Sequence, residues 1–218
     1  FDAEAVRTVM AAALPAMRPG AIWLQCSTIG VEAARELAGL AGAAGVRFVD
    51  APVLGTKAPA QAGTLTTLVA ASDAILAEVQ PVLAATSAKV VRAGVEAPAA
   101  SALKLAMNAW IATITAGIAQ SLAIASRLGL DPELVLESLR GGAADSPYAH
   151  LKGGAMLAGG FDPQFELVGL LKDVRLARAA VPELPQELLA ALDALYGAAA
   201  DGGAAHEDIA AVWRAFQD

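Results

Sequence analysis

Residues 99–128 read AASALKLAMNAWIATITAGIAQSLAIASRL, and this stretch separates two differently built parts of the chain. It holds no proline, and at 1.5 Å per residue it predicts one helix about 45 Å long. Lys104, Asn108, Gln120 and Arg127 interrupt the apolar run. A membrane span needs about 20 predominantly apolar residues, so a buried helix is the preferred interpretation.

Before this helix, short apolar runs alternate with segments of helical periodicity. The expected strands are residues 21–26, 46–53, 64–70 and 88–93, the second of them broken by Pro52. The expected helices are residues 1–17, 31–44 and 73–83. Ser27 and Thr28 are expected to cap the second helix with their hydroxyls, and residues 54–63 to form a loop. Alternating strands and helices predict an α/β layer.

After residue 98 the sequence predicts helices alone. The expected segments are residues 131–139, 153–157, 165–180, 184–200 and 207–216. The chain is thus expected to divide into residues 1–97, an α/β part, and residues 98–218, an all-α part.

Composition excludes several classes of protein. The 218 residues carry 15 Lys and Arg against 22 Asp and Glu, a net charge of −7, and no basic run. Binding to nucleic acid through phosphates needs clustered positive charge, so no nucleic-acid partner is expected. Cys26 is the single cysteine, and the two histidines lack a ligand spacing, so neither a disulfide nor a metal site is predicted. The acidic charge is consistent with a cytoplasmic protein. The high apolar content, 56%, favours extra burial in a subunit interface.

Lys104 is the first candidate for chemistry, because lysine is scarce here and this one lies among apolar residues. Desolvation would lower its pKa toward values useful for proton transfer. Asn108 lies one turn further on the same helix face and could orient a substrate oxygen. The competing interpretation is a lysine that extends to solvent beside an ordinary polar residue.

Two other segments are weaker candidates. Lys172 and Asp173 are adjacent in a helical pattern, where a surface ion pair is the default and a ligand contact the minority interpretation. In residues 51–65, Gly55 and Thr56 could offer backbone N–H groups and a hydroxyl to an anion, although glycines are also common in turns.

Four segments together resemble the β-hydroxyacid dehydrogenase family, which includes 3-hydroxyisobutyrate dehydrogenase and resembles 6-phosphogluconate dehydrogenase. The matching segments are CSTI at 26–29, DAPVLGTKAPAQAGTL at 50–65, KLAMN at 104–108 and FELVGLLKDVRLA at 165–177. The KAPA stretch at 57–60 is most similar to the glyoxylate/succinic semialdehyde reductase branch.

The resemblance implies a Rossmann-type α/β domain, incomplete here, followed by an all-α domain, joined by a long interdomain helix. It implies hydride transfer between NADP or NAD and a small hydroxy acid, aldehyde or keto acid. Lys104 and Asn108 would be catalytic, Leu54, Gly55 and Thr56 would bind substrate, and the cofactor would contact Ser27, Thr28 and Lys172. The long apolar helix over 99–128 is expected to pack against a second copy of itself, in a homodimer where the carboxy-terminal helices of one subunit help close the other's cleft.

Two departures from the family pattern matter. The sequence contains no G-x-G-x-x-G phosphate loop, so the amino-terminal part of the dinucleotide domain is expected to precede residue 1. Leu54 stands where most relatives have serine, which removes a hydroxyl donor and makes the pocket more apolar.

These departures keep two alternatives open. One is an enzyme similar to imine reductases with an apolar pocket, although such relatives usually carry aspartate or tyrosine at the position of Lys104. The other is a non-catalytic dimerisation or dinucleotide-binding module, a type of relative that loses this lysine.

Overall fold

The computed structural model describes residues 2–217 and divides into two compact units. Unit 1 contains the chain up to Met107 together with Ala179–Val181, and unit 2 contains Asn108–Arg178 and the residues from Pro182 onward. The division falls inside one long helix, α5 (Ala99–Arg127). The domain boundary at residues 97/98 stays a prediction.

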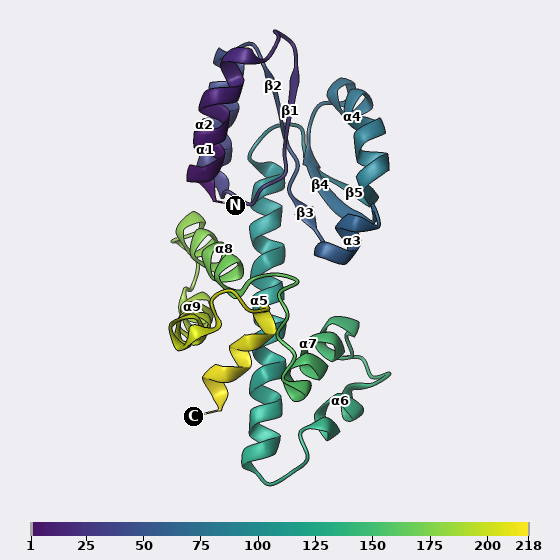
Figure 1. Ribbon diagram of the computed structural model, residues 1–218, viewed down its shortest axis with the longest axis vertical. Helices are drawn as coiled ribbons and strands as arrows, with labels where there is room; N and C mark the ends of the chain where they lie inside the picture. Colours follow the sequence, from purple (N-terminus) through teal and green to yellow (C-terminus); the bar gives the residue numbers. More distant parts are fainter. Residues whose placement is uncertain (1, 218) are drawn as a thin grey trace. The chain divides into compact units, whose positions relative to one another are not determined.

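Unit 1 is an α/β layer built on a five-stranded mixed sheet (Figure 1). Its strands are β1 (Ile22–Gln25), β2 (Arg47–Asp50), β3 (Val53–Leu54), β4 (Leu65–Ala70) and β5 (Ser87–Gly94). β1 pairs with β2 and β4 with β5 in parallel, whereas β4 is antiparallel to β2 and β3. The strand expected at 46–53 is broken at Pro52, as predicted, because Pro52 lacks the N–H that a continuous ladder needs, and the chain forms two strands there.

Alternation along the strands separates two packed faces. On one face, Trp23 and Phe48 pack with α1 (Ala3–Ala13) and α2 (Val31–Ala43), with their ring centroids 4.9 Å apart. On the other face, Val49 and Val69 pack with α4 (Asp73–Thr86). The start of α5 also packs on β4, because Ala100 contacts the cluster of Leu68 and Ala70.

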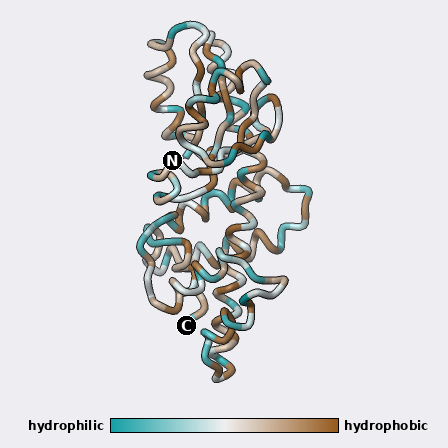
Figure 2. Tube along the Cα trace, turned by 90° about the vertical axis from the view of Figure 1, so that its right-hand side faces the viewer, coloured by the Kyte–Doolittle hydropathy of each residue, from teal (hydrophilic) through white to brown (hydrophobic). Residues whose placement is uncertain are grey.

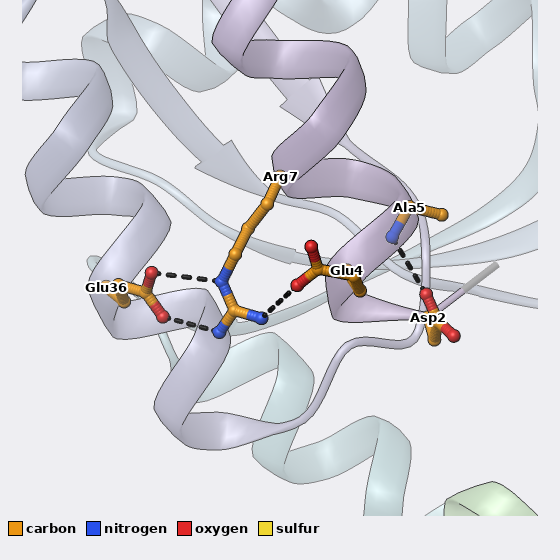
Figure 3. A network of polar contacts seen from close by, with 5 residues as sticks. All are labelled: Asp2, Glu4, Ala5, Arg7 and Glu36. Carbon is orange, nitrogen blue, oxygen red and sulfur yellow. Dashed lines mark hydrogen bonds and ion pairs between the residues drawn. The ribbon is translucent and has the colours of Figure 1, made fainter.

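Helices α1 and α2 are also joined at the surface (Figure 3). Arg7 donates to the two carboxylate oxygens of Glu36 from Nε at 3.0 Å and from Nη2 at 2.6 Å. Asp2 caps α1 by accepting from the backbone N–H of Ala5 at 2.8 Å. The helix expected over 1–17 changes to a 3₁₀ turn over Leu14–Ala16, where Pro15 interrupts α-helical bonding.

Two local expectations in unit 1 are wrong. Ser27 and Thr28 do not cap α2, because its N-cap is Gly30 with φ +85° and no side-chain cap bond. That left-handed backbone favours glycine and turns the chain into the helix without a hydroxyl. Residues 54–63 are not all loop, because they include the short helix α3 (Lys57–Gln61).

In its described residues, unit 2 is all-helical apart from one isolated bridge between Glu166 and Asp208. Its elements after α5 are α6 (Glu133–Leu139), α7 (Pro147–Ala158), α8 (Leu167–Ala180), α9 (Glu187–Ala199), the π-helical turn Ala200–Ala204 and the 3₁₀ helix Ile209–Phe216. α7 begins at Pro147 rather than at 153, because Ser146 caps the Ala149 N–H and proline suits the first helical position.

The core of unit 2 forms around the second part of α5. Ala112, Ala119 and Leu122 are fully buried there, and they belong to one cluster with residues from α8, α9 and the 3₁₀ helix. Figure 2 shows polar residues interspersed with apolar ones along the chain. Helical periodicity places Ala112 and Ala119 on the buried face of α5. The small alanine side chains allow neighbouring helices to approach this face closely.

A buried ion pair fixes the end of the chain to α7. Lys152 Nζ donates to Asp208 Oδ1 at 2.7 Å, and both side chains are nearly inaccessible. The Asp208 carboxylate also accepts from the backbone N–H groups of Gln164, Phe165 and Ala210, at 3.2, 3.3 and 3.0 Å. Charge and hydrogen bonds thus compensate the burial of both groups.

Among the described residues, α5 is the one helix whose length and composition would allow it to cross a membrane. Of its most apolar window, 44% is buried within the fold. A core helix meets the same criteria, so this property is weak evidence for a membrane span.

Candidate active site

Lys104 and Asn108 lie one turn apart on α5, as the sequence predicted. Lys104 is 7% exposed and Asn108 is fully buried. The competing interpretation, a lysine extending to solvent, does not hold for Lys104. Buried lysine and asparagine side chains need polar partners, and Asn108 has one in Asp173.

Asn108 and Lys172 are brought together by one carboxylate in unit 2. Asp173 accepts from Asn108 Nδ2 at 2.5 Å through Oδ2, and from Lys172 Nζ at 2.7 Å through Oδ1. Asp173 is only 2% exposed, whereas the Lys172 side chain is 29% exposed. The ion pair expected between Lys172 and Asp173 is present, but it does not lie wholly at the surface. The Asp173 carboxylate is buried and binds both the partly accessible ammonium group of Lys172 and the amide of Asn108.

The beginning of α5 is held by a second buried carboxylate, in unit 1. Asp50, the last residue of β2, accepts from the backbone N–H of Ser101 at 2.7 Å and from Ser101 Oγ at 2.7 Å. Burial raises the pKa of Asp50, while the hydrogen bonds from Ser101 and from the Ala100 backbone oppose that rise.

Ser27 and Thr28 follow β1, where the side chain of Gln25 holds the backbone. Gln25 is buried, and its amide accepts from the Ser27 N–H at 3.2 Å and donates to the Ser27 carbonyl at 2.7 Å. This two-way contact fixes the peptide groups of Ser27 at the carboxyl end of a parallel strand. Ligands of open α/β sheets bind outside that end.

Leu54, Gly55 and Thr56 connect β3 to α3. Leu54 is half-buried and packs against the cluster of Leu68, Ala70 and Ala100. Gly55 has φ +119°, and a Cβ there would lie 2.8 Å from Leu65 Cδ2. A side chain at position 55 is therefore excluded by both backbone conformation and space.

No three His, Cys, Asp or Glu side chains come together as a metal site anywhere in the part of the chain that the structure describes. His150 instead contacts Asp145 at 2.7 Å, and His206 contacts Glu166 at 3.4 Å.

Sequence reasoning missed the roles of three polar residues in this arrangement: Gln25, Asp50 and Asp173. The role of Asp50 had one detectable signal in the sequence. Pro98 precedes α5 and its side chain cannot accept from a helix N–H, so the helix start needs an acceptor from another segment. For Asp173 the pairing with Lys172 was expected, whereas its bond to Asn108, 65 residues away, is identified only by the fold. For Gln25 the two-way contact with Ser27 was not predicted.

Two family models match the chain, one in each part. Residues 2–94 match the model of the NAD-binding domain of 6-phosphogluconate dehydrogenase. Residues 98–216 match the model described as NAD-binding of NADP-dependent 3-hydroxyisobutyrate dehydrogenase. The second match alone spans more than half of the chain.

Individual relatives cover most of this chain but only part of their own length. An uncharacterised oxidoreductase of Synechocystis is 32% identical over 92% of this chain and 69% of its own. Glyoxylate/succinic semialdehyde reductase 2 of Arabidopsis thaliana, a chloroplastic protein, is 31% identical over 79% of this chain and 49% of its own.

The solved structure of 3-hydroxyisobutyrate dehydrogenase from Mycobacterium tuberculosis with L-serine is similar over the whole chain. Its TM-score is 0.89 at 27% identity, over 100% of this chain and 77% of the other. The same order of a Rossmann-like sheet and a helical region is present in both. The chain therefore belongs to the β-hydroxyacid dehydrogenase family, whose members are NAD(P)-dependent dehydrogenases and reductases.

Proposed function

We propose that the protein transfers hydride between NAD(P)H and a small aldehyde or keto acid, forming the corresponding hydroxy acid, with Lys104 as general acid and base. The observation that carries the proposal is the burial of Lys104 on α5, one turn from the buried Asn108. A buried ammonium group can give up a proton more readily than an exposed one, which suits proton transfer near neutral pH.

The protein's own residues would handle the proton and the orientation. In reduction, Lys104 Nζ gives a proton to the carbonyl oxygen as the carbonyl carbon accepts hydride, and in oxidation it removes the hydroxyl proton. Asn108 Nδ2 is held by Asp173, and this contact fixes the plane of the amide. The other end of that amide is then aligned to orient lysine or substrate.

The cofactor would be held by Ser27, Thr28 and Lys172. The peptide groups of Ser27 are fixed by Gln25, and Lys172 carries a partly exposed positive charge. Each of these residues offers a hydrogen-bond donor to a dinucleotide, whereas the sequence has no G-x-G-x-x-G loop for the pyrophosphate. When bound, the nicotinamide ring supplies or accepts the hydride.

The substrate would lie against Leu54, Gly55 and Thr56. Gly55 and Thr56 would offer backbone N–H groups and a hydroxyl to a substrate carboxylate, and the positive φ of Gly55 sets the direction of the chain there. Leu54 offers no hydroxyl and adds apolar surface beside them. This combination favours a short acid whose chain carries an apolar group.

The same apolar residue favours a second candidate, reduction of an imine. Leu54 suits a substrate without a carboxylate, while Lys104 favours the first candidate, because an ammonium group protonates a carbonyl oxygen directly. Turnover of glyoxylate and succinic semialdehyde, compared with turnover of one cyclic imine, separates the two.

We further propose a cytoplasmic homodimer that acts on small molecules rather than on nucleic acid or membranes. Support comes from the exposed apolar side chains on α5, including Trp110 at 58% and Ile124 at 53%. Large exposed apolar residues gathered on one helix are typical of interfaces. Sedimentation should give a dimer, and Trp110→Glu should shift it toward monomer. A monomer at all concentrations contradicts this part of the proposal.

The catalytic assignment is tested with Lys104→Ala in the full-length protein. General acid catalysis is worth about 10²- to 10⁴-fold, so turnover should fall by that factor while dinucleotide affinity and circular dichroism stay unchanged. Lys89→Ala removes an exposed lysine from β5 and serves as the matched control. Near-normal turnover by Lys104→Ala would show that Lys104 is not the acid. Failure of the wild-type protein to bind dinucleotide at millimolar concentration would favour a non-catalytic module.

A further inference from the structure

We propose that Asp50 is a positioning residue for Lys104, acting through the amino-terminal turn of α5. This inference rests on the proposed function, since it concerns the placement of the proposed acid. Asp50 touches neither substrate nor cofactor in this proposal. Its effect passes through Ser101, which lies three residues before Lys104 and therefore on the same side of the helix.

The beginning of α5 lacks a local cap. The Pro98 carbonyl accepts from the Ala102 N–H at 2.8 Å, so Pro98 occupies the N-cap position. A proline side chain cannot accept a hydrogen bond from the second or third helical N–H, as serine or aspartate would. Ser101 is the third helical residue, and its N–H would lack a side-chain acceptor without a residue from elsewhere.

Asp50 supplies that acceptor from 51 residues away. One carboxylate oxygen accepts from the Ser101 backbone N–H and the other from Ser101 Oγ, both at 2.7 Å. Two bonds to one residue fix the rotation of the helix about its axis as well as the position of its end. The negative charge also lies at the positive end of the helix dipole, where it is favourable.

The two hydrogen bonds between Asp50 and Ser101, called the anchor below, are buried and lie one turn before Lys104. Asp50 is fully buried, Ser101 is 2% exposed and Lys104 is 7% exposed. Asp50 ends β2, which is paired to both β1 and β4. The anchor therefore connects the sheet directly to the helical turn that carries the lysine, and a rotation of this turn would displace Nζ.

Asp50→Asn is the main variant, because it keeps the shape and replaces one acceptor oxygen with a donor NH₂. The Ser101 hydroxyl can accept from that NH₂, so the variant keeps the contact but replaces two charge-assisted hydrogen bonds with neutral bonds that are roughly half as strong. A displacement of about 1 Å in a catalytic group can cost about 100-fold, so kcat should fall between about 10- and 100-fold. Dinucleotide affinity should change less than about twofold, and the isotope effect from deuterated cofactor should rise as chemistry becomes slower.

The matched control is Asp131→Asn, the same exchange at another helix start. Asp131 Oδ1 accepts from the Glu133 N–H at 2.9 Å and lies in unit 2 at the exposed beginning of α6. This variant should keep kcat and the isotope effect of the wild type. Ser101→Ala removes the hydroxyl bond to Asp50 and should also lower kcat, which provides a second measurement if Asp50→Asn does not fold.

Hydrogen exchange gives a readout that does not need turnover. Amides 101–105 should exchange faster in Asp50→Asn, or in Ser101→Ala, but not in Asp131→Asn. Unchanged exchange in both anchor variants overturns the anchor whatever the enzyme does. Faster exchange with unchanged kcat and isotope effect overturns the link to Lys104. If the wild type turns over no carbonyl or imine substrate, the proposed function fails, while the exchange experiment still decides on the anchor.

Discussion

Asn108 Nδ2 donates a hydrogen bond to Asp173 Oδ2 at 2.5 Å, across 65 residues of sequence and inside a buried environment. Because the second oxygen of Asp173 accepts from Lys172 Nζ at 2.7 Å, one carboxylate holds two residues proposed to work on different molecules. The orientation of the amide and the position of the ammonium group are therefore coupled in unit 2.

Replacing Asp173 should disturb both residues at once. In Asp173→Asn the new NH₂ faces a donor, so the contact to Asn108 or to Lys172 is lost. We expect kcat to fall about tenfold or more and the KM for dinucleotide to rise, because a group positioned by a charged hydrogen bond loses its alignment. Steady-state kinetics with varied cofactor measures both effects.

Asp193→Asn is the control for this variant. Asp193 pairs with Arg175 and Arg178 between α8 and α9, without contact to Asn108 or Lys172 in the described residues. It should leave kcat unchanged. Equal kinetics for wild type and Asp173→Asn would remove Asp173 from the site.

Substrate preference should respond to Leu54→Ser. The hydroxyl restores a donor beside Gly55, so the ratio of kcat/KM for glyoxylate over an aldehyde with an apolar chain should rise. A gain of about tenfold corresponds to one hydrogen bond worth about 1.4 kcal/mol. Competing-substrate assays measure the ratio directly.

Leu54 also packs in unit 1, so loss of stability must be separated from loss of preference. Val91→Ala weakens the same cluster of Leu68, Ala70 and Ala100 from β5 and adds no hydroxyl. Both variants should unfold at lower denaturant concentration, but only Leu54→Ser should change the substrate ratio. A ratio that changes equally in both would assign the effect to packing.

The buried pair of Lys152 and Asp208 should give unequal losses when either partner is removed. Breaking a buried ion pair costs about 3–5 kcal/mol. In Lys152→Met the Asp208 carboxylate keeps three backbone donors, whereas Asp208→Ala leaves Lys152 and those three N–H groups without that acceptor. We expect Asp208→Ala to lose more unfolding free energy in urea titrations, and equal losses would mean that the backbone donors contribute little.

Tyr148 should make the stability of the protein fall at alkaline pH. Burial, followed by the charge of Asp208, raises the pKa of Tyr148 to about 12, although Thr115 opposes this rise. An unfolded tyrosine has a pKa of about 10, so the folded state holds its proton more tightly. The resulting stability is complete below about pH 10 and is lost as the pH rises through about 12.

Tyr148→Phe removes this titration. The unfolding free energy of the wild type should therefore fall more steeply than that of Tyr148→Phe between about pH 10 and pH 12. Tyr196 is present in both proteins, and the charge of Tyr148 raises the pKa of Tyr196 further in the wild type alone, which adds to the same difference. Parallel curves would mean that Tyr148 has an ordinary pKa in the folded protein.

Local sequence signals predicted the helices better than the connections between elements. The long helix was expected over 99–128 and is observed over Ala99–Arg127, because continuous helix-forming residues lie between a proline and a glycine. Pro52 and Gly30 were harder to interpret. A proline can interrupt a strand or end it, and only pairing with β4 shows that the chain begins a new strand at Val53.

The candidate site was predicted in the same uneven way. Lys104 and Asn108 are related by helical spacing, which can be recognised in a sequence, and they do lie one turn apart. The burial of Asp173 could not be predicted, because an adjacent Lys and Asp on a helix are usually at the surface.

The sequence by itself determined the order of an α/β part and a helical part, the long helix and the residue types available for chemistry. These depend on periodicity and on contacts within a few residues. Only the tertiary structure decided that Asp50 caps α5 and that Asp173 holds Asn108. The physical reason is that a buried carboxylate needs donors, and the donors available are set by which distant segments pack around it.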